Sequence, residues 1–228
     1  MYSLEDLEKC TKKDLLLISK KYRISYAQKY KKKDLIIKIQ EKQDFSTEKI
    51  QPIFVNNKKY TKIIHISDIH IRPLTRHEEF EKVFEKLYSF LENTKEYNNN
   101  RIIAITGDLL QEKDNLKPET LLICRKFLKK CALYGSVIVI AGNHDMLENN
   151  TNRLDNISAI VDDLPIHYCI NSGSYQFGNL IISVSSLVDK KFIQSYQVET
   201  NNLTHICLYH GSIIGSTTDL GHTIQDIE

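Results

Sequence analysis

The sequence contains no apolar run that is long enough to cross a bilayer. A membrane-spanning helix needs about 20 mostly apolar residues in a row, and the N-terminus also lacks the apolar core of a secretory signal peptide. The chain has five cysteines, none of them in a Cys-x-x-Cys pair. This spacing disfavours a zinc ribbon and a disulfide framework. We therefore expect a soluble, intracellular protein with no membrane contact.

Neither sign of charge is in large excess, because the net charge of the 228 residues is only +2. The distribution is uneven, however: residues 1–45 hold twelve Lys or Arg against seven Asp or Glu. With 41% hydrophobic and 26% charged residues, the composition is that of a globular protein with a sizeable core. The length allows one large domain or one domain with a small appendage.

Residues 1–45 have the pattern of short helices. Thr11 followed by Asp14 predicts a capping box at the start of one helix, and residues 32–40 predict a second, amphipathic helix. Residues 23–31 between them lack helical periodicity. This arrangement resembles the SAP and Rho-N modules, which are small helix-extended-helix units that bind nucleic acid. The alternative is a basic helical hairpin that packs on the main domain or binds another protein.

If the module binds nucleic acid, its basic segment should contact the phosphates. A lysine acts there as a point charge, which positions the protein without reading the base sequence. We expect these nucleic-acid contacts from Lys29, Lys31, Lys32 and Lys33.

Three apolar runs further along the chain each end in polar residues. Residues 62–66, 101–105 and 136–140 are rich in β-branched side chains, which predicts buried strands. Open α/β sheets bind their ligands at the carboxyl ends of such strands. Those ends carry Asp68 with His70, Asp108, and the turn Asn143-His144-Asp145. Carboxylates, imidazoles and an amide at one sheet edge suit a pair of divalent metals that bind phosphate oxygens.

These clusters, together with one more near the C-terminus, follow the order of a known family. Asp68-Ile69-His70, Gly107-Asp108, Gly142-Asn143-His144-Asp145 and Tyr209-His210-Gly211 resemble the successive motifs of the calcineurin-like metallophosphoesterases. The resemblance implies an α/β fold, in which a metallophosphoesterase β-sandwich is flanked by helices and preceded by a small all-α module. We expect the module at 1–45, a linker at 46–60 and the metallophosphoesterase domain at 61–228.

The resemblance also implies a set of metal ligands. Asp68 and His70 would hold one metal, Asp108 would bridge, and Asn143 and His210 would hold the second. The expected cofactors are two divalent metal ions, with Mn²⁺ as the family's ion. Taken singly, each Asp or Asn has a structural alternative, since such a residue at a strand end can cap a helix or brace a turn.

The catalytic role falls by the same resemblance on His144, which would orient or protonate the leaving oxygen. Residues 148–155 look like the segment that follows this motif in the SbcD-type DNA repair nucleases, with Arg153 and Asp155 bracing the site. The implied function is a metal-dependent phosphodiesterase acting on DNA, with an SMC-like ATPase as partner. The alternatives are a phosphatase or small-molecule phosphodiesterase, and a nucleic-acid-binding protein whose catalytic half is inactive.

The sequence departs from the family pattern in two places. Gln111 stands in the region after Gly107-Asp108 where the family often has a His. Gly221-His222 offers only one His where the family closes with a Gly-x-His or Gly-His-x-His turn. We therefore expect that the sequence stops before the true closing motif and that His222 lies in a loop. An Arg and a His just past a metal motif could contact a substrate phosphate, but we favour the alternative that Arg76 and His77 form the polar first turn of a helix.

Overall fold

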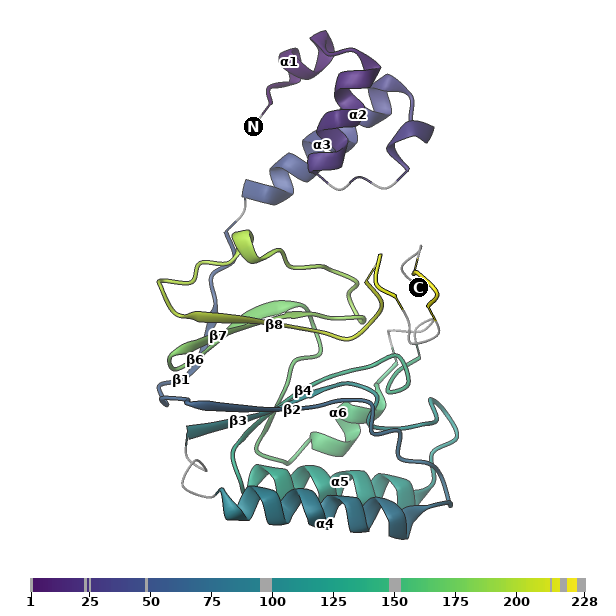
Figure 1. The fold of residues 1–228 in the computed structure, drawn as a ribbon, viewed down its shortest axis with the longest axis vertical. Coiled ribbons are helices and arrows are strands. Elements are labelled where there is room, and N and C mark those ends of the chain that lie inside the picture. Colours follow the sequence, from purple (N-terminus) through teal and green to yellow (C-terminus); the bar gives the residue numbers. More distant parts are fainter. Residues whose placement is uncertain are drawn as a thin grey trace. The chain divides into compact units, whose positions relative to one another are not determined.

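Four short helical segments form the N-terminal part of the chain (Figure 1). The computed structural model describes residues 2–22, 24, 26–47, 49–94, 100–147, 153–213, 215–217 and 221–224. Within it the chain divides into two compact units, Met1–Ile50 and Gln51–Glu228. No helix in the described part of the chain has both the length and the apolar character that a membrane crossing requires.

The first unit is built from the helices that capping residues and apolar spacing specify. Its elements are α1 (Leu4–Lys9), α2 (Lys12–Lys21), the 3₁₀ turn η1 (Ala27–Lys29) and α3 (Lys32–Thr47). The predicted capping box of α2 is confirmed, because the backbone N–H of Thr11 donates to Asp14 at 2.9 Å and that of Asp14 donates back to Thr11 at 3.3 Å. The core of the unit consists of Leu7, Leu15, Ala27, Leu35, Ile36 and Ile39.

The second unit contains a parallel sheet formed by the three predicted strands and one more. The sheet runs in the order β2 (Lys62–Ile66), β3 (Arg101–Thr106), β4 (Ser136–Ile140) and β5 (Ile166–Tyr168). Every residue of β3 is buried. A strand that is covered on both faces has no polar side to alternate with, which explains its continuous apolar sequence.

One face of this sheet is covered by the helices α4 (His77–Asn93), α5 (Pro118–Ala132) and α6 (Asn156–Val161), as Figure 1 shows. Alternate residues of the strands point to this face, so Ile103 and Ile105 share a core with Phe84 and Phe127 of the helices. Pro118 stands in the first turn of α5, where its missing N–H costs no intrahelical hydrogen bond.

The other face packs on a second sheet. Its strands lie in the order β1 (Ile53–Asn56), β6 (Gly173–Phe177), β7 (Leu180–Ser185) and β8 (Thr204–Tyr209). Ile102 and Ala104 of β3 pack there against Phe177, Ile182 and Val184. The predicted α/β sandwich with flanking helices, preceded by N-terminal helices, is thereby confirmed.

Two segments differ from the sequence expectations. Within the range 46–60, expected to be a linker, Ile53–Asn56 forms β1 and pairs in parallel with β6. Helix α3 also runs on to Thr47. A four-residue strand between polar residues carries too little periodicity to be recognised, and only its pairing with β6 makes it a strand. Strand β5, which lies beyond the three expected strands in the sequence, pairs in parallel with β4 and completes the first sheet.

Candidate metal centre

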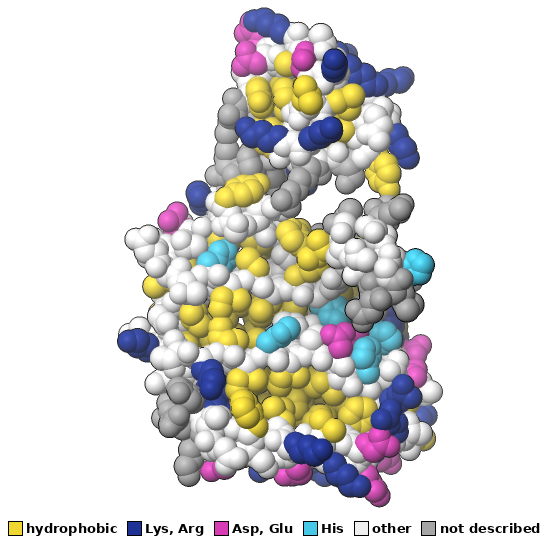
Figure 2. Space-filling model, in the orientation of Figure 1, with side chains coloured by type: hydrophobic (Ala, Val, Ile, Leu, Met, Phe, Trp, Pro, Cys, Tyr) yellow, Lys and Arg dark blue, Asp and Glu magenta, His cyan; other side chains and the backbone are white. Residues whose placement is uncertain are grey.

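Four strands from both sheets place polar residues at one edge of the sandwich. In the first sheet Ile66 pairs with Ile105 and Thr106 pairs with Ile140, so the ends of β2, β3 and β4 lie level. Two groups of possible ligand atoms form there, each with its atoms within 4.8 Å of one another: His70, Asp108 and His144, and Asp68, Asp108 and His210. Figure 2 shows histidine and acidic side chains lying together on this face.

Asp108 belongs to both groups. One of its carboxylate oxygens, Oδ2, lies 3.5 Å from Nε2 of His70, and the other, Oδ1, lies 3.5 Å from Nε2 of His210. The residue is only 4% exposed. Two donor atoms that bind one cation at about 2.1 Å stand about 3.0–3.5 Å apart. The spacing on each side of Asp108 therefore matches that of two ligands of a common ion.

His210 is held by the backbone of β3. Its Nδ1 donates a hydrogen bond to the carbonyl oxygen of Thr106 at 2.7 Å, and its Nε2 lies 3.1 Å from Oδ1 of Asn143. The Asp108 carboxylate, against the opposing effect of burial, raises the pKa of His210 to about 9. Burial works against the ionised form of Asp108, but His210 and the backbone N–H of His144 outweigh it and keep the pKa of that carboxyl below its ordinary value.

His70 completes the opposite side of the cluster. Its Nε2 also lies 4.0 Å from Oδ1 of Asp68, whose other carboxylate oxygen accepts a hydrogen bond from the Ser67 hydroxyl. The Nδ1 atom of His70 is buried and has no hydrogen-bond partner among the residues that the structure describes. Its ring meets the ring of His144 edge-on, with 4.8 Å between the centroids.

His144 is fixed by two hydrogen bonds. Its Nδ1 lies 2.7 Å from the carbonyl oxygen of Gln111, and its backbone N–H donates to Oδ1 of Asp108 at 2.9 Å. Because a carbonyl can only accept, Nδ1 carries the proton, and Nε2 is the nitrogen left for other chemistry. The backbone of Gln111, not its side chain, thus supplies the contact from this region.

Three of the expected ligands have a left-handed backbone conformation. Asp68, His70 and Asp108 have φ angles of 55°, 50° and 53°, a conformation that is uncommon outside glycine and costs energy. Backbone hydrogen bonds between the loops hold this conformation. The N–H of Asp68 donates to the carbonyl oxygen of Gly107 at 3.1 Å, and the N–H of His70 donates to the backbone carbonyl oxygen of Asp108 at 2.9 Å. Strain of this kind persists where the surrounding structure over-determines it, which is typical of functional sites.

Gly142 allows the β3 and β4 loops to meet. A Cβ atom at this position would lie 2.1 Å from Oδ1 of Asp108 and 2.4 Å from its backbone nitrogen. Real carbon–oxygen contacts are longer, so any side chain here would displace the central carboxylate.

Asp145 is a positioning residue that the sequence did not distinguish from its neighbours. It is completely buried, and its two oxygens accept hydrogen bonds from the backbone N–H of Gly142 at 2.9 Å and of Leu110 at 3.1 Å. Burial raises the pKa of its carboxyl. Asp145 therefore holds the two loops together by hydrogen bonds. Only its complete burial distinguishes it from a candidate metal ligand.

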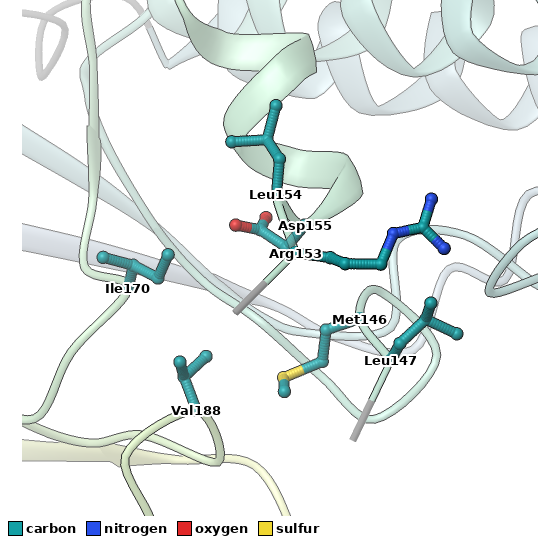
Figure 3. A pocket seen from close by; sticks show the side chains of 7 residues that line it. All are labelled: Met146, Leu147, Arg153, Leu154, Asp155, Ile170 and Val188. Carbon is teal, nitrogen blue, oxygen red and sulfur yellow. The ribbon is translucent and has the colours of Figure 1, made fainter. Parts of the chain in front are cut away.

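The remaining expected residues lie outside the cluster. Asp155 caps α6 by accepting from the N–H of Ser158 at 2.8 Å, and it also accepts from the Tyr168 hydroxyl at 2.8 Å. Figure 3 shows Arg153 and Asp155 at a small pocket near Met146, with their charged ends pointing to different sides. Their side chains make no contact with the cluster in the described residues, and 148–152 lie outside that part of the chain.

Arg76 and His77 do form the polar start of α4, since Arg76 is its N-cap and pairs with Glu79. His222 is exposed and lies in a loop, as expected.

The four lysines proposed to contact nucleic acid are all exposed in the first unit. Lys29 lies over the ring of Tyr26, with its Nζ 4.4 Å from the centroid. Lys32 donates from Nζ to the carbonyl oxygen of Glu8 at 2.8 Å, at the end of α1. Lys33 lies in the first turn of α3, and Lys31 is the residue directly before that helix.

The fold and its His/Asp cluster define a candidate metal-dependent hydrolase. A family model, Calcineurin-like phosphoesterase, matches residues 61–223. The chain belongs to the calcineurin-like phosphoesterase family.

A relative among curated proteins is an uncharacterized protein of Acanthamoeba polyphaga mimivirus. It is 34% identical over 176 residues, which are 72% of this chain and 13% of the relative. The chain thus spans only a small part of that protein's length. Among solved structures, the crystal structure of Pseudomonas putida nuclease MPE matches 53% of this chain and 51% of its own, with 20% sequence identity and a TM-score of 0.33.

Proposed function

We propose that the second unit is a metal-dependent phosphodiesterase that holds two divalent cations, Mn²⁺ being the expected ion. Asp68 and His70 would hold one cation, Asn143 and His210 the other, and Asp108 would be shared. The observation that carries this proposal is the position of Asp108, whose two oxygens face two different histidines at 3.5 Å each.

The residues present fit such a pair of cations. The Nδ1 of His210 is occupied by the Thr106 carbonyl, which leaves Nε2 on the side of Asp108 and Asn143. A backbone acceptor on the far nitrogen is the usual way in which a protein orients a metal-binding histidine. The absence of a side chain at Gly142 keeps the Asp108 carboxylate in its central place. Oxygen and imidazole donors together suit divalent first-row metals.

When bound, two such cations stabilise negative charge on the phosphate and lower the pKa of water. The chain's own contribution lies in position and in proton transfer. Because Nδ1 of His144 is anchored on Gln111, its Nε2 can hold or give a proton at the leaving oxygen without the ring having to turn. Asp145 keeps the loops of Asp108 and His144 at a constant distance.

The cation part of the proposal is tested by metal-dependent stabilisation. Mn²⁺ at about 100 times its Kd should stabilise the folded chain by about 2.7 kcal/mol, because it binds only the native state. Asp108→Asn should lose most of this effect. The matched control is Asp162→Asn, the same change at an exposed acid at the end of α6. An undiminished response to Mn²⁺ in Asp108→Asn would refute the shared position.

We propose DNA as the substrate, on two grounds. The sequence of residues 148–155 resembles the segment that follows the same motif in the SbcD-type DNA repair exonucleases. The first unit also carries an excess of basic residues. Lys31 and Lys33 are exposed in that unit, and we expect them to neutralise phosphates. We also propose an SMC-like ATPase as a partner, and this proposal has the motif resemblance as its only support.

The DNA proposal predicts a specific change in salt dependence. Each phosphate contact contributes about 0.9 to the slope of log K against log salt on duplex DNA. The double variant Lys31→Ala/Lys33→Ala of the whole chain should therefore lower that slope by about 1.8. Lys126→Ala/Lys129→Ala, on the exposed side of α5, serves as the control. Equal slopes for both variants and the unchanged chain would exclude Lys31 and Lys33 as phosphate contacts. Hydrolysis of small phosphodiesters without any cleavage of DNA would favour a small-molecule phosphodiesterase instead.

A further inference from the structure

An apolar groove lies between the loop that follows β2 and the helix α4. It is lined mainly by Ile66, Ile69, Phe80, Val83, Phe84 and Leu87, and its volume is about 390 Å³. This volume falls in the range of about 300–1,000 Å³ that small-molecule sites occupy. Figure 2 shows a cluster of hydrophobic side chains directly below the histidine and acidic side chains of the cluster.

The groove adjoins the candidate metal centre at His70. His70 lines the groove, and the same ring lies 3.5 Å from the central carboxylate of Asp108. A ligand with one end at the cluster can therefore place its next group in the groove without leaving the surface. The loop between them is held in an unusual conformation, since Leu74 and Arg76 are left-handed, with φ angles of 57° and 61°.

The charges at the edge of the groove are not balanced. Arg72 and Arg76 both line it. Arg76 is neutralised by Glu79, which accepts from its Nε at 2.7 Å. The Arg72 guanidinium is exposed and makes no ion pair or hydrogen bond with any residue that the structure describes. Among the described residues, Arg72 is thus a cation without an ionic partner, beside an apolar groove and next to the candidate metal centre.

We propose that this groove binds the base of a nucleoside phosphate ester whose phosphate lies at the metal centre, with Arg72 contacting an oxygen of that phosphate or of the next. The proposal rests on the proposed phosphodiesterase function and specifies its substrate class. The occupant needs a flat apolar body of about the size of the groove and an anionic end beside it. A nucleoside phosphate combines these features, and its base packs well on aromatic side chains such as Phe80.

The test is equilibrium binding of two phosphates that differ only in the nucleoside. Thymidine 5′-monophosphate and methyl phosphate are titrated into the whole chain in saturating Mn²⁺. Stacking of one base strengthens binding about 5- to 150-fold, so the nucleotide should bind at least about fivefold more tightly. Val83→Asp places a charge in the groove and should abolish that preference. Val83 is 59% exposed, so the change should not disturb folding. Leu122→Asp is the matched control at a residue of α5 that is 51% exposed, and it should keep the preference.

Three results would overturn the proposal. The unchanged chain could bind both phosphates equally, or Val83→Asp could keep the full preference for the nucleotide. As a third result, Val83→Asp could change the sedimentation behaviour of the chain but not its nucleotide affinity. That outcome would assign the groove to contact with another protein chain. The underlying function is checked separately by turnover of methyl p-nitrophenyl phosphate. A chain that prefers the nucleotide but turns over no ester would support the groove and refute the phosphodiesterase.

Discussion

Adding a methyl group at Gly142 is the sharpest perturbation that the structure offers. In Gly142→Ala the new Cβ would lie 2.1 Å from Oδ1 of Asp108 and 2.4 Å from its backbone nitrogen. Relief of this overlap needs a shift of about 1 Å, and overpacking of this kind typically costs about 1–3 kcal/mol. Moving the carboxylate also breaks the hydrogen bond from His144, at about 1–3 kcal/mol for a buried acceptor. We expect a loss of unfolding free energy of about 2–6 kcal/mol.

The same shift should weaken metal binding. Changes next to a metal ligand typically cost 10–100-fold in affinity. At a Mn²⁺ concentration of about 100 times the Kd of the unchanged chain, stabilisation by the metal is about 2.7 kcal/mol, and a 100-fold weaker site retains only about 0.4 kcal/mol. Urea denaturation with Mn²⁺ and with a chelator measures both effects.

Gly215→Ala is the control for this experiment. A Cβ at Gly215 meets nothing within 4 Å, while its φ of +88° makes any side chain there strained. It should therefore lose about 1–2 kcal/mol from backbone strain alone and keep the full response to Mn²⁺. If Gly142→Ala kept an undiminished metal response, the Asp108 carboxylate would not be the shared ligand, and the reasoning would be refuted.

Two further predictions concern buried groups away from the ligands. Asp145→Asn leaves only one acceptor oxygen for the two backbone N–H groups of Gly142 and Leu110. It should therefore lower the free energy of unfolding by about 1–3 kcal/mol, measured by urea denaturation. A loss no larger than that caused by Asp162→Asn would contradict the positioning role of Asp145. Burial, with a smaller effect from the charge of Lys58, lowers the pKa of His167 below its ordinary value of 6.5. Between that lowered pKa and 6.5 the unfolded chain binds more protons than the folded one, so this part of the stability is present above 6.5 and is lost as the pH falls through the window. His167→Gln should flatten this dependence of Tm on pH, and an unchanged dependence would exclude the group as its source.

Much of the second unit could be read from local patterns. A strand covered on both faces must be apolar throughout, so runs such as Ser136–Ile140 reveal both a strand and a parallel sheet. The end of such a strand is a place for chemistry, which directs attention to Asp108 and His144. The motif order then predicted the family and the fold. Helix starts were equally readable, because Thr11 and Pro118 act within a few residues of their own positions.

Other features depended on contacts between distant residues. Four residues at Ile53–Asn56 form a strand only because β6 pairs with them. Asp145 resembles a ligand in sequence, and only burial and two backbone donors make it a brace. The groove beside His70 exists because α4 packs at the edge of β2, which no local pattern specifies.

Local propensity thus determined which residues of this protein form strands and which polar residues follow them. The tertiary structure alone decided which of their atoms meet. His210 and Thr106 are 104 positions apart in the chain, yet the ring of one donates to the carbonyl of the other at 2.7 Å. That contact depends on the packing of two sheets, in which each strand's position is set by nonlocal burial and pairing. The position of Asp108 between two histidines follows from this packing, and the proposed pair of cations rests on it.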